Sequence, residues 1–184
     1  MPVKFVATCS NPLQERACKS LGIEVFKDYA TTYGEISPDC VTDFSVHCFN
    51  SETLKTLQTL GVRRVTLHPE LNLAQMRDIE KIVETEVVIY GKIPLMKLGN
   101  PCVQGITTDR TGAKFWVNGD ILYNSVPIFI ADKMKEIEKA GIAHGRLIFT
   151  TETEEEVRTI IKAYMYRKML KIDFTRGKFF TKIS

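Results

Sequence analysis

Short apolar segments rich in β-branched residues alternate along the chain with longer segments in which apolar residues recur at helical spacing. The short segments predict β-strands, and the longer ones predict amphipathic helices. The predicted strands span residues 3–8, 23–29, 42–48, 62–67, 86–90, 121–130 and 146–150. The predicted helices span residues 13–21, 52–60, 73–84, 132–140 and 154–168. Strand and helix therefore alternate through most of the sequence.

Residues that favour the start or the end of a helix stand at the borders of these segments. Asn11 followed by Pro12 suits a helix start, and Gly22 suits the left-handed turn that ends a helix. Residues 72–75 and 153–156 have the spacing of a capping box, in which the first and fourth residues satisfy each other's backbone N–H groups. These signals support the predicted helix boundaries.

The alternation predicts an α/β fold in which parallel strands are joined by right-handed helical crossovers. A complete eight-stranded barrel typically needs about 250 residues, and this chain has 184. We therefore expect a single domain, residues 1–184, that forms a partial TIM-like (β/α) barrel. The turn at residues 109–112 predicts a β-hairpin inserted at about residues 105–118. No glycine-rich phosphate loop follows a predicted strand, which argues against a nucleotide-binding sheet.

Composition narrows the range of function classes. An apolar fraction of 44% and a charged fraction of 26% are typical of a globular protein. The net charge of +3 is too small to indicate a nucleic-acid or membrane partner by itself. The longest apolar runs, at about six residues, are too short to span a bilayer, and the first residues show no signal-peptide pattern. Five cysteines without CxxC spacing indicate reduced thiols, so we expect a cytoplasmic protein without a membrane partner.

Chemically active residues follow several predicted strands, where parallel α/β folds collect their sites. The candidates at these strand ends are His68, Glu70, Tyr90, Lys92 and Asn124. Glu70 follows a proline turn that could aim its carboxylate into a site as a general acid or base, although a helix cap or a surface acid is the alternative. The sequence alone leaves these two roles of Glu70 open.

Metal binding and thiol catalysis are two further interpretations of the same region. A soft-ligand metal set could be drawn from His47, Cys48, His68, Glu70 and Cys102. Their spacings match no standard zinc pattern, so we predict no metal site. Neighbouring residues of a strand point to opposite faces, which excludes a dyad of His47 with Cys48. A thiol hydrolase would therefore need a pair such as Cys102 with His68.

Five stretches of the sequence resemble peptidase family U32, the collagenase-like peptidases. They are FSVHCFNSETLKTLQTLGVRRVTLHPELNL at 44–73, EVVIYGKIPLM at 86–96, TDRTGAKFWV at 108–117, AGIAHGRLIFTTETEEEV at 140–157 and FTRGKFF at 174–180. The resemblance extends from about residue 40 to the end of the chain. It implies that the chain corresponds to the C-terminal part of the family's catalytic β/α-barrel domain.

The resemblance also implies functional residues, carried over position by position: Glu70, Tyr90, Lys92, Pro94, Met96, Asn124, Arg146 and Arg176. We expect catalytic roles for Glu70, Tyr90 and Lys92, and for Cys102 as the candidate thiol. We expect Asn124, Arg146 and Arg176 to bind substrate, together with the strand-end residue His68. Lys92 stands where the family commonly has Arg, and His68 stands where it commonly has Ser. Because Lys cannot form the paired hydrogen bonds of a guanidinium, anion recognition at position 92 is expected to differ from the family pattern.

The resemblance also bears on cofactors. Similar proteins that hydroxylate RNA or a quinone precursor use an iron–sulfur cluster, which usually needs four thiolates. The corresponding segment here, KLGNPCVQGITT at 97–108, contains Cys102 as its single cysteine. We therefore expect this chain to hold neither the family's iron–sulfur cluster nor another cofactor or metal.

Three functions follow as hypotheses. The first is a U32-family peptidase, or a fragment of one, that acts on peptides. The second is a family member that hydroxylates RNA or a quinone without an iron–sulfur cluster of its own. The third is a non-catalytic partial barrel that binds a partner chain or a second copy, because an open sheet edge favours association. The substrate is accordingly expected to be a peptide or an RNA.

Overall fold

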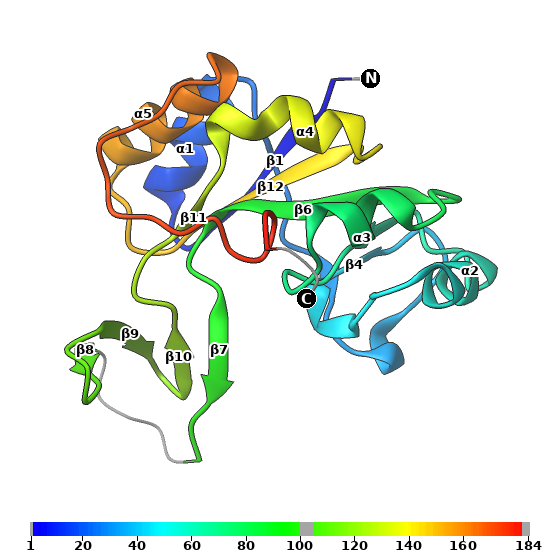
Figure 1. The fold of residues 1–184 in the computed structure, drawn as a ribbon, viewed down its shortest axis with the longest axis horizontal. Coiled ribbons are helices and arrows are strands. Elements are labelled where there is room, and N and C mark those ends of the chain that lie inside the picture. The colour runs from blue at the N-terminus through cyan, green and yellow to red at the C-terminus, as the bar shows by residue number, and fades with distance from the viewer. Residues whose placement is uncertain (1, 100–104, 182–184) are drawn as a thin grey trace.

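A curled β-sheet forms the centre of the computed structural model, which describes residues 2–99 and 105–181 (Figure 1). Its strands follow the order β2-β1-β12-β6-β5-β4-β3, and every pairing along this path is parallel. An eighth strand, β11, pairs with β6 in antiparallel fashion. The strands are β1 (Lys4–Cys9), β2 (Glu24–Val25), β3 (Tyr29–Ala30), β4 (Val41–Thr42), β5 (Arg64–Thr66), β6 (Glu84–Gly91), β11 (Ile128–Phe129) and β12 (His144–Phe149).

Helices connect the parallel strands and cover the outside of the curl (Figure 1). They are α1 (Pro12–Ser20), α2 (Ser51–Thr59), α3 (Leu73–Asp78), α4 (Met134–Lys139) and α5 (Glu154–Met165), with short 3-10 turns η1 (Tyr33–Glu35), η2 (Phe44–Val46) and η3 (Ala131–Lys133). Within the described ranges, no helix has the length and apolar character needed to cross a membrane. The architecture is a partial α/β barrel, which confirms the fold class predicted from the sequence.

The two edges of the curled sheet are formed by consecutive parts of the chain. Strand β2 pairs with β1, and the N–H of Phe26 continues this edge by donating to the carbonyl of Ala7 (2.9 Å). Strand β3 pairs with β4, where the N–H of Asp43 donates to the carbonyl of Ala30 (2.8 Å). The single strand predicted at 23–29 is therefore wrong, because this segment leaves one edge of the sheet and joins the other.

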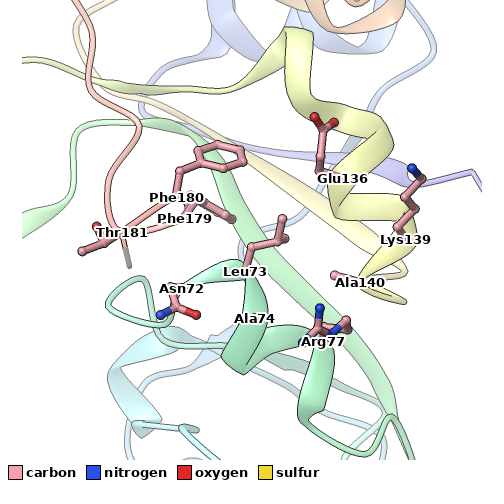
Figure 2. Close-up of a pocket in the computed structure, with 10 residues that line it drawn as sticks. All are labelled: Asn72, Leu73, Ala74, Arg77, Glu136, Lys139, Ala140, Phe179, Phe180 and Thr181. Atoms are coloured by element: carbon pink, nitrogen blue, oxygen red, sulfur yellow. The ribbon is translucent and has the colours of Figure 1, made fainter. Parts of the chain in front are cut away.

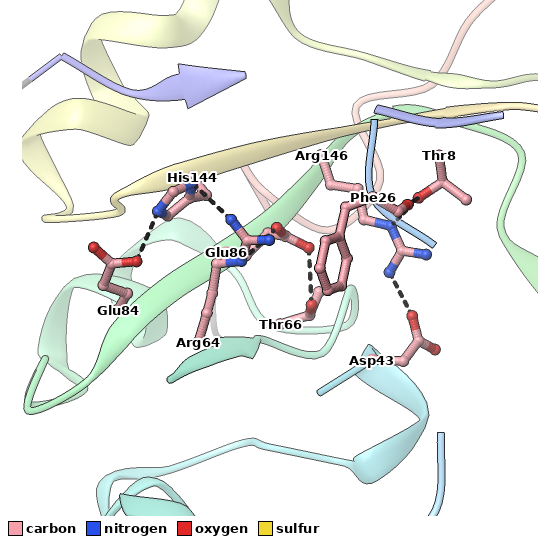
Figure 3. A network of polar contacts seen from close by, with 9 residues as sticks. All are labelled: Thr8, Phe26, Asp43, Arg64, Thr66, Glu84, Glu86, His144 and Arg146. Atoms are coloured by element: carbon pink, nitrogen blue, oxygen red, sulfur yellow. Dashed lines mark hydrogen bonds and ion pairs between the residues drawn. The ribbon is translucent and has the colours of Figure 1, made fainter. Parts of the chain in front are cut away.

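The two faces of the sheet differ in polarity because side chains alternate along a strand. Val65 and Leu147 face outward and belong to the apolar core that also contains residues of every long helix. Arg64 and Thr66, which flank Val65 on β5, and Arg146, which precedes Leu147 on β12, face the inside of the curl (Figure 3). The hydrophobic core thus lies between sheet and helices, and the interior of the curl holds buried polar side chains together with the rings of Phe26 and Tyr29.

A second sheet is inserted between β6 and β11 and projects from the body of the molecule (Figure 1). It contains β7 (Pro94–Lys97), β10 (Ile121–Tyr123), β9 (Lys114–Asn118) and β8 (Gly105–Thr108), paired antiparallel in that order. The β8–β9 hairpin confirms the predicted insertion, and the carboxylate of Asp109 accepts the N–H groups of Thr111 and Ala113 in its turn. The insertion is wider than predicted, since β7 and β10 extend it on one side.

Local side-chain contacts explain two segments for which the sequence prediction is wrong. Residues 42–48 do not form one strand, because the carboxylate of Asp43 accepts the N–H of Ser45 and starts the turn η2. The helix predicted over 73–84 ends at Asp78, where the ammonium group of Lys81 donates to the carbonyls of Met76, Arg77 and Ile79. Polar side chains that the hydrophobic pattern does not take into account thus determine where β4 gives way to η2 and where α3 ends.

Candidate functional site

A cleft of about 590 Å³ lies at the carboxyl ends of β4 and β5, next to the root of the inserted sheet. We call it the mouth cleft. Its lining residues are Phe44, Ser45, His47, His68, Pro69, Glu70, Ile93, Pro94, Leu95, Asn124, Ile128, Thr175, Gly177, Lys178 and Thr181. Three of the residues predicted for the site, His68, Glu70 and Asn124, meet here. This position is the one that parallel barrels use for their sites.

His68 follows β5 and is held from two directions. Its backbone N–H donates to the carbonyl of Cys48 (3.1 Å), and its ring nitrogen Nδ1 accepts the N–H of Glu70 (3.3 Å). Burial lowers the pKa of His68, which favours the neutral ring. Because Nδ1 accepts, the proton of the neutral ring sits on Nε2. His68 can therefore act in the mouth cleft as a hydrogen-bond donor without carrying a charge.

His47 enters the sequence analysis as a metal-ligand candidate and as the neighbour of Cys48, and the structure places it beside His68. The two ring centroids lie 5.2 Å apart, and both rings contact Phe49, at 6.3 Å from His47 and 4.3 Å from His68. His47 has a left-handed backbone (φ 59°, ψ 49°), which is uncommon for a residue other than glycine. The sequence pattern gives no sign of this turn, because it resembles a strand.

Arg146 lies inside the curl of the sheet rather than in the mouth cleft (Figure 3). Its guanidinium donates to the carboxylate of Asp43 (2.5 Å) and to the hydroxyl of Thr8 (3.0 Å). It also lies over the ring of Tyr29, with 3.7 Å between Cζ and the ring centroid. Only 6% of Arg146 is exposed, so direct contact with a substrate would require the substrate to enter the interior.

Tyr90 and Lys92 line a different cleft, of about 570 Å³, beside the N-terminus of α5. The hydroxyl of Tyr90 donates to the carboxylate of Glu152 (2.9 Å), and burial together with that carboxylate raises the pKa of Tyr90. The ammonium group of Lys92 lies 5.9 Å from the centroid of the Trp116 ring. The structure therefore separates these two predicted residues from His68 and Glu70.

Two predicted site residues remain. Arg176 forms paired contacts with the carboxylate of Asp132 (2.5 and 3.0 Å) and donates to the carbonyl of Phe129 (3.2 Å), so it fastens the C-terminal segment to the body. Cys102 lies outside the described residues, and its predicted catalytic role stays a prediction.

A third hollow, of about 610 Å³, lies between α3 and α4 and contains none of the predicted site residues (Figure 2). Its wall is formed by the apolar side chains of Leu73, Phe179 and Phe180, with Arg77 and Lys139 at the opposite end. We call it the helix hollow. It shares Thr181 with the mouth cleft, whereas Arg77 and Lys139 do not line the mouth cleft, so these two residues can serve as reference positions for experiments on that cleft.

The described residues do not fit an iron–sulfur cluster. Across 2–99 and 105–181, no three His, Cys, Asp or Glu side chains converge as metal ligands. The thiols of Cys9 and Cys18 face each other at 3.6 Å within the core, and Cys48 is buried elsewhere. A cluster held by four thiolates of this chain has no matching donor set among these residues.

The fold and the position of the mouth cleft define a parallel α/β barrel protein with its candidate site at the carboxyl ends of the strands. The sequence profile of peptidase family U32 matches residues 35–179. The chain belongs to this family. The matched range includes His68, Glu70, Asn124 and Arg146.

More distant similarity links the chain to a reductase. It is 24% identical over 158 residues to a protein named 4-hydroxy-tetrahydrodipicolinate reductase from Listeria monocytogenes serotype 4b, and 23% identical to one from Listeria innocua serovar 6a. The matched residues cover 86% of this chain and 56% of each relative, so the chain spans about half the length of these proteins. No solved structure matches the chain significantly.

Proposed function

We propose that the chain is a U32-family peptidase that binds a peptide in the mouth cleft and hydrolyses it there. The observation that carries this proposal is the convergence of His47, His68 and Glu70 at the carboxyl ends of β4 and β5. A donor and a carboxylate placed together are the groups that hydrolysis of an amide requires. The family match supports the peptide as substrate class.

In this proposal each residue has one task. The Nε2–H of neutral His68 donates to the oxygen of the scissile carbonyl and stabilises the negative charge that develops there. The carboxylate of Glu70 takes a proton from the attacking water, whose oxygen bonds to the carbonyl carbon. The same proton then passes to the leaving amine as the C–N bond breaks. Asn124 lies across the cleft, where its amide can bind the peptide backbone.

The reductase similarity does not lead us to propose a reduction. In dinucleotide-binding folds a glycine-rich turn after the first strand brings the backbone close to the pyrophosphate. Here β1 ends at Cys9, and Ser10 and Asn11 lead directly into α1, where the side chain of Asn11 accepts the N–H of Gln14. This turn starts and caps a helix and contains no glycine that would bring the backbone close to a phosphate.

Peptide binding without cleavage is the second candidate. It is favoured by three apolar side chains of the inserted sheet that are largely exposed, Leu95 at 50%, Met96 at 56% and Ile106 at 72%. A bound chain would cover such a surface. Association with a second copy or a partner, hydroxylation of RNA or a quinone, and a cytoplasmic location stay predictions.

Cleavage of fluorescein-labelled gelatin and casein tests the proposal. We expect His68→Ala and Glu70→Gln each to lower kcat/KM by about 100-fold, the usual contribution of one acid–base or oxyanion group. Arg77→Gln, which alters the helix hollow, is the matched control and is expected to cleave like the unaltered protein. The proposal fails if the unaltered protein does not cleave either substrate, or if His68→Ala and Glu70→Gln cleave as fast as it does.

A further inference from the structure

A buried ion pair lies directly beneath the mouth cleft. Arg146 on β12 and Asp43 after β4 come from strands that are not neighbours in the sheet, and their side chains meet across the inside of the curl (Figure 3). Asp43 is 9% exposed and Arg146 is 6% exposed. Thr8 and the ring of Tyr29 hold the guanidinium on two further sides. The position of the Asp43 carboxylate is thus fixed from the interior.

Asp43 connects the buried Arg146 to η2, whose residues Phe44 and Ser45 line the mouth cleft. One carboxylate oxygen binds Arg146, and the other accepts the N–H of Ser45 (3.2 Å) as the cap of η2. The carbonyl of Asp43 accepts the N–H of Val46 (3.1 Å), which closes the turn. Asp43 is therefore bound both to the interior arginine and to the 3-10 turn that carries Phe44 and Ser45 into the cleft.

The turn η2 ends at His47, whose ring lies beside that of His68. The N–H of His47 donates to the carbonyl of Phe44 (2.9 Å), and the left-handed backbone of His47 turns its ring toward His68. The ring of Phe44 lies near both Arg146 and His68. Its centroid is 6.0 Å from the guanidinium carbon of Arg146 and 6.4 Å from the ring centroid of His68. Contacts thus run continuously from Arg146 to both histidines.

We propose that Arg146 and Asp43 are positioning residues of the mouth cleft, which set the placement of the His47 and His68 rings through η2. Neither residue touches the substrate in this account. The expected loss of peptide cleavage in the variants rests on the proposed function. The expected displacement of the His47 and His68 rings does not. An interior arginine that the family resemblance implies as substrate-binding is thereby assigned a different role.

A second ion pair in the molecule provides the control. Arg167 after α5 and Glu138 on α4 form an ion pair of 2.7 Å, and neither residue lines the mouth cleft. Arg167→Met therefore removes an ion pair between two separate segments without touching η2 or the cleft. If ion pairs act only on general stability, the two pairs should have equal effects on the cleft.

The chain contains three histidines, so their ring signals can be followed individually by NMR. We expect Asp43→Asn and Arg146→Met to displace the signals of His47 and His68, and Arg167→Met to leave them in place. The charged groups that act on His68 are Glu70, His47 and Asp43. Loss of the Asp43 charge should lower the pKa of His68, and loss of the Arg146 charge should raise it.

The opposite changes of the His68 pKa report charge alone. Ring signals are therefore compared at about pH 8, where a histidine with an ordinary or lowered pKa is neutral, so that displacement in both variants reports a change of ring placement. Asp43→Asn keeps the shape of the side chain and provides the test if Arg146→Met does not fold. The inference is overturned if the ring signals stay unchanged in folded Asp43→Asn, or if Arg167→Met displaces them equally. In the cleavage assay, kcat/KM should fall about tenfold or more in Asp43→Asn. If no form of the protein cleaves peptides, the proposed function fails while the NMR result still decides this inference.

Discussion

Arg64 and His144 form a hydrogen bond of 3.1 Å between Nη1 and Nδ1 inside the curled sheet (Figure 3). A guanidinium only donates, so Nδ1 of His144 accepts and the ring proton sits on Nε2. That nitrogen lies 3.0 Å from the carboxylate of Glu84 and donates to it. The neutral ring of His144 thus links a cation to an anion at the amino ends of the strands, opposite the mouth cleft.

This arrangement predicts that stability depends on pH. Burial, with the charge of Arg64 as a second cause, lowers the pKa of His144, and burial lowers that of His68. As the pH falls below the ordinary histidine value of 6.5, the unfolded chain takes up protons that the folded chain resists. The free energy of unfolding should therefore be highest above that value and decrease toward about pH 5.

Urea unfolding at neutral pH and at about pH 5 measures this effect. His144→Asn should reduce the difference between the two midpoints, because it removes one of the two groups. Equal midpoints at both pH values in the unaltered protein would contradict the neutral, buried state of these rings.

The buried pair of Arg64 and Glu86 gives a second prediction. Nε of Arg64 lies 3.3 Å from Oε2 of Glu86, and the side chains are 3% and 0% exposed. Arg64→Met leaves the Glu86 carboxylate buried without its partner, which should lower the free energy of unfolding by about 3 to 5 kcal/mol. Urea titration checks the value. In Arg64→Met/Glu86→Leu the unpaired charge is gone, so the double variant should be more stable than Arg64→Met; a less stable double variant would speak against this account.

A third prediction concerns Gly91, where the chain leaves β6 for the inserted sheet. Its φ is +129°, and a Cβ there would lie 2.5 Å from the carbonyl oxygen of Ile148. Gly91→Ala should therefore destabilise the protein by more than the roughly 1 to 3 kcal/mol that a left-handed backbone alone costs. Gly119→Ala is the control, because Gly119 has φ +64° and open space around it. Thermal melts of the two variants that coincide would refute the predicted clash.

Cysteine reactivity gives a fourth prediction. Cys9, Cys18 and Cys48 are buried, and Cys40 is partly exposed. Burial raises the pKa of Cys48 to about 11, and the contact with the Cys18 thiol is the main cause that raises the pKa of Cys9. Brief treatment with iodoacetamide followed by mass spectrometry should label Cys40 well ahead of these three. All four cysteines should react at similar rates in urea. Equal labelling of the four in the folded protein would contradict the burial of Cys9, Cys18 and Cys48.

The α/β class and the inserted hairpin could be predicted from the sequence because both depend on local patterns. Apolar runs such as VVIY at 87–90 mark buried parallel strands, and the turn at 109–112 marks a hairpin. The end of α3 and the turn η2 could not be predicted in this way. They depend on single polar side chains, Lys81 and Asp43, whose local hydrogen bonds to the backbone leave no mark in the apolar pattern. The contact of Asp43 with Arg146 also joins residues that only the folded chain brings together.

The candidate site could be predicted in part for the same reason. His68, Glu70 and Asn124 follow strands or the insertion, and the carboxyl ends of parallel strands meet at one edge. Tyr90 lies near the carboxyl end of β6, yet its hydroxyl lies against Glu152 beside α5. A bulge in the pairing of β6 with β12 lies next to Tyr90, and a shift of register changes the face to which a strand residue points.

NMR signals of the histidine rings can show whether a peptide binds in the mouth cleft. A tryptic digest of casein would be added to the isotope-labelled protein, with the three ring signals followed by NMR. We expect the signals of His47 and His68 to shift with peptide concentration, while that of His144, buried at the far end of the strands, stays in place. Signals of His47 and His68 that remain unchanged at saturating peptide would contradict the assignment of the mouth cleft as the substrate site.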